Sequence, residues 1–320
     1  MSNVELAPGE EVVGGDTASG PVREVLAGRE VVLGLRGDTV IRTLPHRDRR
    51  MVGAWCFVDL FGPQDIAGTS GMQVPPHPHT GLQTVSWLVS GQILHRDSLG
   101  SLELIEPGQL NIMTAGRGIS HSEESPGDHG PILHGAQLWV ALPAGARHVE
   151  PAFAHHADLP TVAVGGLAVT VLLGELAGAV SPARAYTPIV GAEVSAAAPG
   201  EALLPLRPDF EYAALPLAGG VEIDGAGVEP GPLVYLGRGR SAVTVRTHGA
   251  ARLLLLGGEP FEEQIVMWWN FVGRTHDEIA TYRAGWATGD GFGTVRGYAG
   301  GPLPAPPLPT TRLKPRGRHR

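Results

Sequence analysis

Glycine and proline recur so often along this chain that they limit the length of every regular element. The sequence has 46 glycines and 28 prolines among 320 residues. Neither residue suits the interior of a long helix, and both favour the turns between short strands. Hydrophobic residues make up 42% of the chain, which is ordinary for a globular protein and sufficient for a core. We therefore expect an all-β body of short strands.

The length and the changes of composition divide the chain into four parts. A chain of 320 residues exceeds one compact core of ordinary size, so we expect two domains, at residues 26–160 and 161–299. Residues 1–25 are small, polar and acidic, and are expected to form a loose arm. Residues 300–320 are rich in proline and end basic, and are expected to form an extended, mobile tail.

Short β-like stretches separated by turn signals occur in two series. The first series comprises residues 30–35, 82–88, 92–96, 102–105, 110–113, 136–141 and 167–173. The second comprises residues 211–216, 220–223, 233–235, 242–246 and 252–256. Residues 259–286 form the one stretch that is long and amphipathic enough to predict a helix near the end of the chain.

Two pairs of side chains predict a metal site in the first series. His77 and His79 are two residues apart, a spacing that points both imidazoles to one face of an extended segment. His121 and Glu123 repeat that spacing further along the chain. Three neutral imidazoles and one carboxylate suit a borderline divalent cation and leave two positions of an octahedron for other ligands. Iron(II) fits this donor set, with manganese, nickel, copper, cobalt or zinc as substitutes.

The two series resemble copies of one plan, in which only the first copy has metal ligands. The turn at Gly91 matches that at Gly220, and Pro107 matches Pro230. With these alignments, His77 corresponds to Leu206, His79 to Pro208, His121 to Thr244 and Glu123 to Arg246. The second domain is therefore expected to keep the scaffold without the metal site.

Charge, cysteine content and hydropathy exclude several classes of function. The formal charge of -8 disfavours direct binding to nucleic acid. No uninterrupted apolar run reaches the ~18 residues of a membrane span. The acidic start of the chain does not resemble a secretion signal, and the single cysteine needs no oxidising compartment. A cytoplasmic location is the expectation.

Several ordered motifs resemble those of the pirin family, a group of bicupins within the cupin superfamily. They are residues 77–81, 89–91, 95–100, 113–123 and 137–140. The resemblance implies two tandem cupin-type β-barrels of the jelly-roll kind, followed by a short C-terminal helix. It also implies that His77, His79, His121 and Glu123 are ligands of one iron ion. Thr80, where pirins usually have arginine, and the long segment 65–74 depart from the family pattern and affect the expected substrate.

The resemblance further implies an activity like that of quercetin 2,3-dioxygenase. The expected substrates are a small phenolic compound of the flavonol type and O2, and the expected products include carbon monoxide. Glu123 is the candidate catalytic base as well as a ligand, provided that it detaches from the cation, because a bound carboxylate is a weak base. The alternative function is a metal- or redox-sensing protein that regulates a protein partner.

Other residues have functional and structural interpretations that the sequence leaves open. His95 could support the metal pocket or be a structural histidine. Arg117 could steady a substrate oxygen or form a salt bridge that fixes its turn. We expect His155 and His156 on the surface, and Cys56 buried and unreactive. Trp268 and Trp269 are expected to pack the terminal helix onto a barrel.

Overall fold

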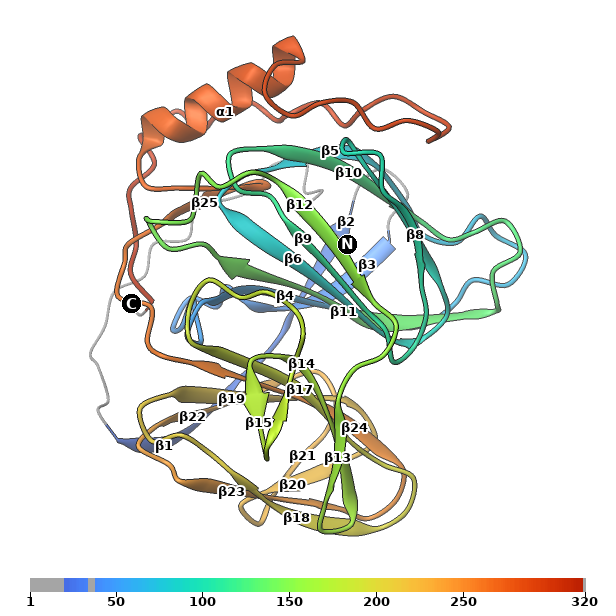
Figure 1. Cartoon of the computed structure of the whole chain (residues 1–320), viewed down its shortest axis with the longest axis vertical. Coiled ribbons are helices and arrows are strands. Elements are labelled where there is room, and N and C mark those ends of the chain that lie inside the picture. The colour runs from blue at the N-terminus through green and yellow to red at the C-terminus, as the bar shows by residue number, and fades with distance from the viewer. Residues whose placement is uncertain (1–19, 34–37, 319–320) are drawn as a thin grey trace.

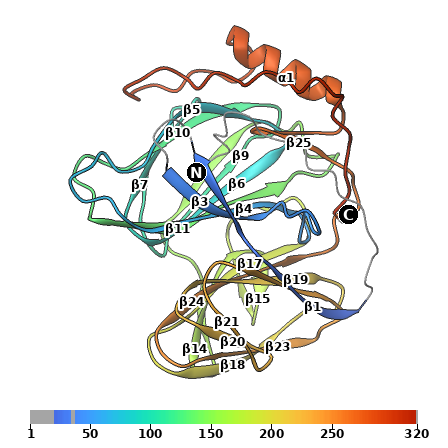
Figure 2. The same cartoon turned by 180° about the vertical axis from the view of Figure 1, so that it is seen from behind.

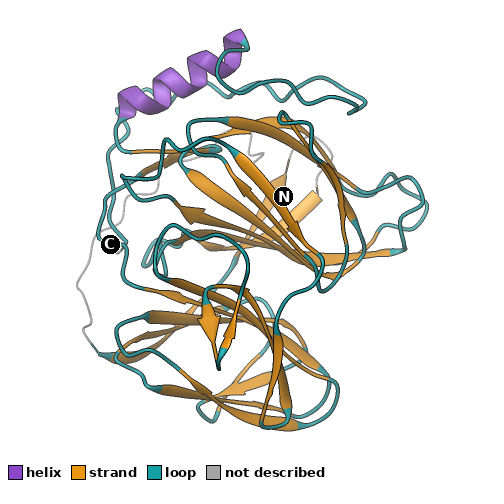
Figure 3. Ribbon diagram, in the orientation of Figure 1, coloured by secondary structure: helices purple, strands orange, loops and turns teal. Residues whose placement is uncertain are grey.

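The computed structural model describes residues 20–33 and 38–318, and Figure 1 shows two β-lobes stacked along its vertical axis. The first 19 residues of the predicted N-terminal arm lie outside the described residues. The expected all-β body is confirmed, since strands dominate both lobes (Figure 3). The described part of the chain contains no helix long and apolar enough to cross a membrane.

Each lobe is built from a seven-stranded and a four-stranded antiparallel sheet. In the first lobe the large sheet has the order β12-β9-β6-β11-β4-β3-β2, and the small sheet has the order β5-β10-β7-β8. Its strands are β2 (Arg29–Leu33), β3 (Asp38–Leu44), β4 (Trp55–Asp65), β5 (Gln73–His79), β6 (Leu82–Ser90), β7 (Ile93–Asp97), β8 (Leu102–Ile105), β9 (Leu110–Thr114), β10 (Ile119–Glu124), β11 (Ile132–Ala141) and β12 (Ala152–His156).

The second lobe repeats this strand order. Its sheets have the orders β1-β22-β19-β24-β17-β14-β13 and β18-β23-β20-β21. The strands are β1 (Pro21–Leu26), β13 (Thr161–Val164), β14 (Leu167–Leu173), β17 (Ile189–Ala196), β18 (Gly200–Pro205), β19 (Glu211–Ala218), β20 (Val221–Ile223), β21 (Ala226–Val228), β22 (Leu233–Arg238), β23 (Ala242–Thr247) and β24 (Ala251–Gly258), with a small ribbon of β15 (Glu175–Leu176) and β16 (Ala179–Val180).

The register of the strands corrects the residue alignment between the two copies. Strand β10 pairs Glu123 with His95, and the equivalent pair in β23 and β20 is Val245 with Ile223. The position that matches Glu123 is therefore Val245, which is buried, and not the exposed Arg246. The same register matches His121 to Val243, His77 to Leu204 and His79 to Leu206. A shift of one residue turns a side chain to the opposite face of a sheet. The alignment from sequence therefore matched Glu123 to a side chain on the outer face of β23.

The ends of the chain depart most from the sequence prediction. Residues 21–25 of the expected loose arm belong to β1, which pairs with β22 of the second lobe (Figure 2). The residues after β24 return to the first lobe, where Phe271 bridges Thr80. Segment 261–299 therefore packs against the first lobe, although we expected it in the second domain.

The predicted helix over residues 259–286 is also wrong in extent. Strands β25 (Val266–Trp268) and β26 (Phe271–Gly273) form a hairpin, and α1 spans only His276–Thr288. The hairpin turns at Trp269, whose φ is 53°. The side chain of Thr275 caps the helix by accepting from the backbone N–H of Glu278, and Gly289 ends it in the left-handed conformation.

The proline-rich tail is extended as expected, but it is packed rather than free. Leu313 is buried, and Arg316 pairs with Ile265. The indole N–H of Trp286 donates to the carbonyl of Leu303, whose own N–H donates to the carbonyl of Pro76. The tail therefore covers the edge of the small sheet at β5, where unpaired backbone groups would otherwise face solvent.

Candidate metal centre

The centre lies on the inner face of the small sheet, where β5 and β10 run antiparallel. His77 is directly opposite His121, and Ile119 is opposite His79. Strand β5 is an edge strand, which suits its prolines because they have no backbone N–H to donate. The register shifts beyond His77, so that Glu123 faces Val74. The two-residue spacing in each strand places all four predicted side chains on the buried face.

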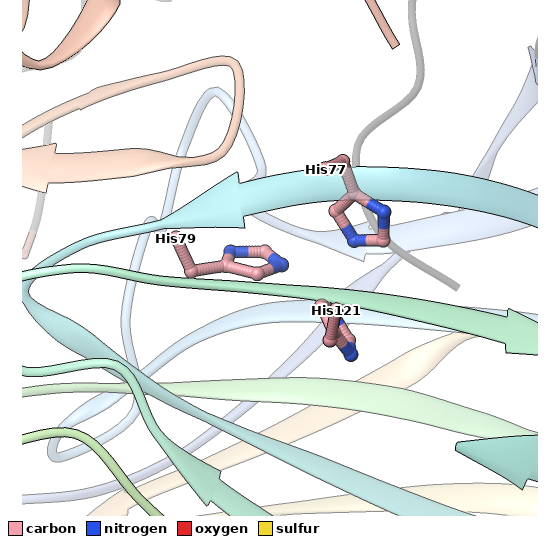
Figure 4. A group of neighbouring side chains, drawn as sticks. All are labelled: His77, His79 and His121. Carbon is pink, nitrogen blue, oxygen red and sulfur yellow. The ribbon is translucent and has the colours of Figure 1, made fainter. Parts of the chain in front are cut away.

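The imidazoles of His77, His79 and His121 lie close together on the two strands, as Figure 4 shows. The ring centroids are 4.4 Å apart for His77 and His121, 5.0 Å for His79 and His121, and 5.1 Å for His77 and His79. One nitrogen from each ring lies within 4.8 Å of one nitrogen from each of the others. The predicted convergence of the three histidines is confirmed, and the cluster has the dimensions to hold a metal ion.

Glu123 is on β10 and lies beside His121 and His95, not in the group that His77, His79 and His121 form. Its carboxylate forms a second group of candidate ligand atoms with His121 and His95, again within 4.8 Å. The hydroxyl of Ser86 lies 3.2 Å from Oε1 of Glu123 and 3.0 Å from Oε1 of Gln137. These contacts hold the carboxylate from the large sheet, because Ser86 is on β6 and Gln137 is on β11.

Backbone carbonyls orient two of the three imidazoles. Nδ1 of His77 lies 2.8 Å from the carbonyl oxygen of Pro75, and Nδ1 of His79 lies 3.1 Å from that of Asn270. A carbonyl only accepts hydrogen bonds, so each Nδ1 must carry the proton and each Nε2 keeps its lone pair. Nε2 of His77 is buried with no hydrogen-bond partner among the described residues. A buried acceptor of this kind fits a cation.

Burial also favours the neutral imidazoles that a metal requires. It lowers the pKa of His77 to about 4. It likewise lowers the pKa of His79 and of His121 well below the usual range, and the nearby His77 adds to both shifts. Near neutral pH all three rings are therefore unprotonated at one nitrogen and can act as ligands.

Two parts of this site are not visible in the sequence. Ser86 is an ordinary strand residue there, and only the packing of the large sheet against the small sheet brings it to Glu123. Asn270 comes from the hairpin that we had assigned to a helix, and it reaches His79 because the segment folds back onto the first lobe. Gly81 permits this approach, since its φ is +68° and a Cβ atom there would lie 2.2 Å from the carbonyl oxygen of Val272.

The structure also places the other residues that the sequence singled out. Arg117 forms an exposed ion pair with Glu150. Of the two interpretations that the sequence leaves open, this is the salt bridge that fixes the turn. Cys56 is buried, as expected, and burial raises its pKa to about 12, which favours an unreactive thiol. Trp268 and Trp269 pack with Ile279 of α1, as expected.

The prediction for the adjacent histidines of β12 was wrong. His155 and His156 are both half-buried rather than on the open surface. Nδ1 of His155 bonds the side-chain oxygen of Asn111 at 2.7 Å, because β12 pairs with β9 and places those residues opposite each other.

The fold and the site define a class: a protein of two cupin barrels, with a buried histidine cluster in the first barrel and an apolar interior in the second. Comparison with known families gives the same result. The Pirin family model matches residues 37–140, and the model of the Pirin C-terminal cupin domain matches residues 191–293. The chain belongs to the pirin family, as its motifs indicated.

Individual relatives match along most of their length. A Pseudomonas aeruginosa protein with the provisional name quercetin 2,3-dioxygenase is 48% identical over 274 residues, which cover 85% of this chain and 87% of that protein. A pirin-like protein of Caulobacter vibrioides is 38% identical, over 78% of this chain and 88% of its own. The crystal structure of a quercetin 2,3-dioxygenase from Acinetobacter baumannii superposes with a TM-score of 0.87 and 42% identity, covering 91% of this chain and 97% of that one.

Proposed function

We propose that this protein is a metal-dependent dioxygenase that opens the ring of a flavonol or a related phenolic compound with O2. The observation that carries the proposal is the convergence of three buried imidazoles, with Glu123 beside His121. Two relatives at 42% and 48% identity are named as quercetin 2,3-dioxygenases, the second provisionally, and they support the choice of substrate class.

The donor set fits a single divalent cation, for which we propose iron(II). His77, His79, His121 and Glu123 would hold it, and three neutral imidazoles with one carboxylate leave room for exogenous ligands. When bound, the cation supplies a Lewis acid that can bring a phenolate oxygen and dioxygen together. The reaction converts one flavonol and one O2 into one ring-opened ester and one carbon monoxide.

The protein's own groups supply orientation and proton transfer. The carbonyls of Pro75 and Asn270 hold two imidazoles in the ligating tautomer. We assign Glu123 as the base for the proton of the substrate hydroxyl, a role that would require its carboxylate to be detached from the cation. Ser86 is positioned to donate a hydrogen bond to Oε1 of that carboxylate. This bond keeps the released carboxylate near the substrate and limits the motion required.

The test is turnover of quercetin by protein loaded with iron(II), with O2 uptake and carbon monoxide followed together. The proposal predicts equal amounts of both, and no reaction by metal-free protein. Glu123→Gln should lose turnover by about 100-fold or more, the contribution of a general base. Glu103→Gln on β8, whose side chain is 41% exposed, is the control for loss of one carboxylate and should remain active.

A protein that holds iron but consumes no O2 with any flavonol would contradict the enzymatic proposal. The regulatory alternative would then be favoured if the iron(II) and iron(III) forms differ in the partners that they capture.

A further inference from the structure

Asp97, His95 and His121 form a line of hydrogen bonds across two strands of the small sheet. Nε2 of His95 lies 3.2 Å from Oδ2 of Asp97, and Nδ1 of His95 lies 3.4 Å from Nδ1 of His121. The register of β7 and β10 places Asp97 opposite His121 and His95 opposite Glu123. Each of these residues is at most 3% exposed, so their hydrogen bonds are shielded from bulk water.

Asp97 is fixed by hydrogen bonds so that its second oxygen faces His95. Its Oδ1 accepts the backbone N–H groups of Leu99 and Ser101, at 2.9 and 3.0 Å. These two bonds turn Oδ1 toward the backbone of Leu99 and Ser101, and Oδ2 then faces the imidazole of His95. The ring of Phe153 stacks on His95 with centroids 4.2 Å apart and an angle of 9°, which holds the plane of the imidazole.

The carboxylate of Asp97 determines which ring nitrogen of His95, and then of His121, carries the proton. A carboxylate cannot donate, so Nε2 of His95 carries a proton, and an imidazole with a single proton on Nε2 has its lone pair on Nδ1. Nδ1 of His121 must then donate to it, which leaves the lone pair of His121 on Nε2. We infer that Asp97 and His95 are positioning residues that set the tautomer of His121 in which Nε2 can bind the cation.

The same geometry allows a competing interpretation, in which His95 is itself a ligand. Nitrogen atoms of His95 and His121 lie within 4.8 Å of a carboxylate oxygen of Glu123. The two interpretations differ in what the lone pair on Nδ1 of His95 does. It accepts a proton from His121 in our proposal, and it would bind the cation in the alternative.

Asp97→Asn tests the inference because it keeps the shape and reverses the polarity. The amide oxygen can still accept from Leu99 and Ser101, while the amide NH2 faces His95 and donates to Nε2. Nδ1 of His95 then becomes a donor, and His121 must hold its proton on Nε2. The same substitution inverts a histidine tautomer in the serine-protease triad. Loss of an outer-shell partner typically weakens metal binding about 10- to 100-fold, and we expect that range here.

Two measurements follow the change without relying on turnover. Ring-nitrogen NMR of the metal-free protein should show His121 protonated on Nδ1 in the wild type and on Nε2 in Asp97→Asn. Cobalt(II) titration should show the weaker affinity in the same variant. Glu103→Gln removes one carboxylate opposite His95 on β8, so it controls for charge and should change neither readout.

His95→Gln separates the two interpretations. The glutamine amide can donate to Asp97 and accept from His121, so it should preserve the tautomer and most of the affinity. If His95→Gln weakens cobalt binding more than Asp97→Asn does, His95 is a ligand and the inference is overturned. Wild-type His121 protonated on Nε2 would also overturn it, even if Asp97→Asn does not fold. The inference rests on the proposed metal site but not on the dioxygenase reaction, and both readouts precede turnover.

Discussion

At the scale of single residues, the ligand spacing was predictable because a strand has a period of two. His77 and His79, and likewise His121 and Glu123, had to share a face once each segment was extended. What holds these side chains in place was not predictable. The carbonyl of Asn270 lies 191 positions from His79 in the chain, so only the fold brings them together. Contacts of that kind leave no pattern in the sequence.

The depressed pKa values of the cluster predict that metal-free protein loses stability as the pH falls. Folded His77 has a pKa near 4, whereas an unfolded histidine titrates near about 6.5. Between these values the unfolded chain takes up a proton that the folded chain does not, so stability is greatest above the unfolded pKa. The loss approaches about 1.4 kcal/mol per pH unit for each such histidine.

Urea unfolding of metal-free protein at a series of pH values measures this effect. Replacing His77 by glutamine should reduce the slope between about pH 6.5 and 4, because one depressed group is removed. His148→Gln changes an exposed histidine and should leave the slope as it is. Equal slopes in all three proteins would show that the buried imidazoles do not titrate as their burial requires.

At the scale of elements, the turns that glycine and proline mark located most strands in the sequence. They did not indicate which strands pair with one another. The predicted stretches correspond to strands such as β6, β9 and β23, yet the alignment of the two copies was off by one residue at β23. Residues 266–273 belong to the stretch 259–286, whose length and amphipathic pattern predict a helix. In the structure these residues form a hairpin instead. The hairpin packs against the first lobe, where Phe271 bridges Thr80.

The turn after His79 should be sensitive to substitution at Gly81. Gly81→Ala adds a Cβ atom that would lie 2.2 Å from the carbonyl oxygen of Val272, in a backbone with φ of +68°. Gly68 has the same φ but nothing within 4 Å of its Cβ position. We expect Gly68→Ala to cost about 1 to 2 kcal/mol from backbone strain alone, and Gly81→Ala to cost clearly more.

Denaturant midpoints of the two glycine variants compare these costs directly. Because Val272 follows Asn270 and Phe271 in the same hairpin, Gly81→Ala should also weaken cobalt binding. Gly68→Ala should not. Equal destabilisation by both substitutions would mean that the hairpin does not approach Gly81 as the structure shows.

At the scale of the whole molecule, buried carboxylates of the second lobe join the two barrels. Glu211 accepts the backbone N–H of Gly53 at 2.7 Å and the hydroxyl of Tyr235 at 2.8 Å, and it is 1% exposed. Glu193 accepts the indole N–H of Trp87 at 2.8 Å. The indole N–H of Trp55 donates to the carbonyl of Val190. We therefore expect the lobes to unfold together.

Glu211→Gln tests this coupling. The substitution removes a buried charge that accepts three hydrogen bonds, one of them from Arg318, so a loss of about 2 to 4 kcal/mol is expected. Glu201→Gln removes an exposed partner of Arg246 and should change stability by less than about 1 kcal/mol. Calorimetry should show a lower transition temperature for Glu211→Gln, and an unchanged profile would contradict the coupling.

We propose that the first lobe holds one divalent cation through His77, His79, His121 and Glu123. The most direct measurement is the calorimetric titration of metal-free protein with cobalt(II), in the wild type and in His77→Ala/His121→Ala. We expect one bound ion per chain in the wild type and none at that site in the double variant. Binding of the same stoichiometry and affinity in both proteins would contradict it.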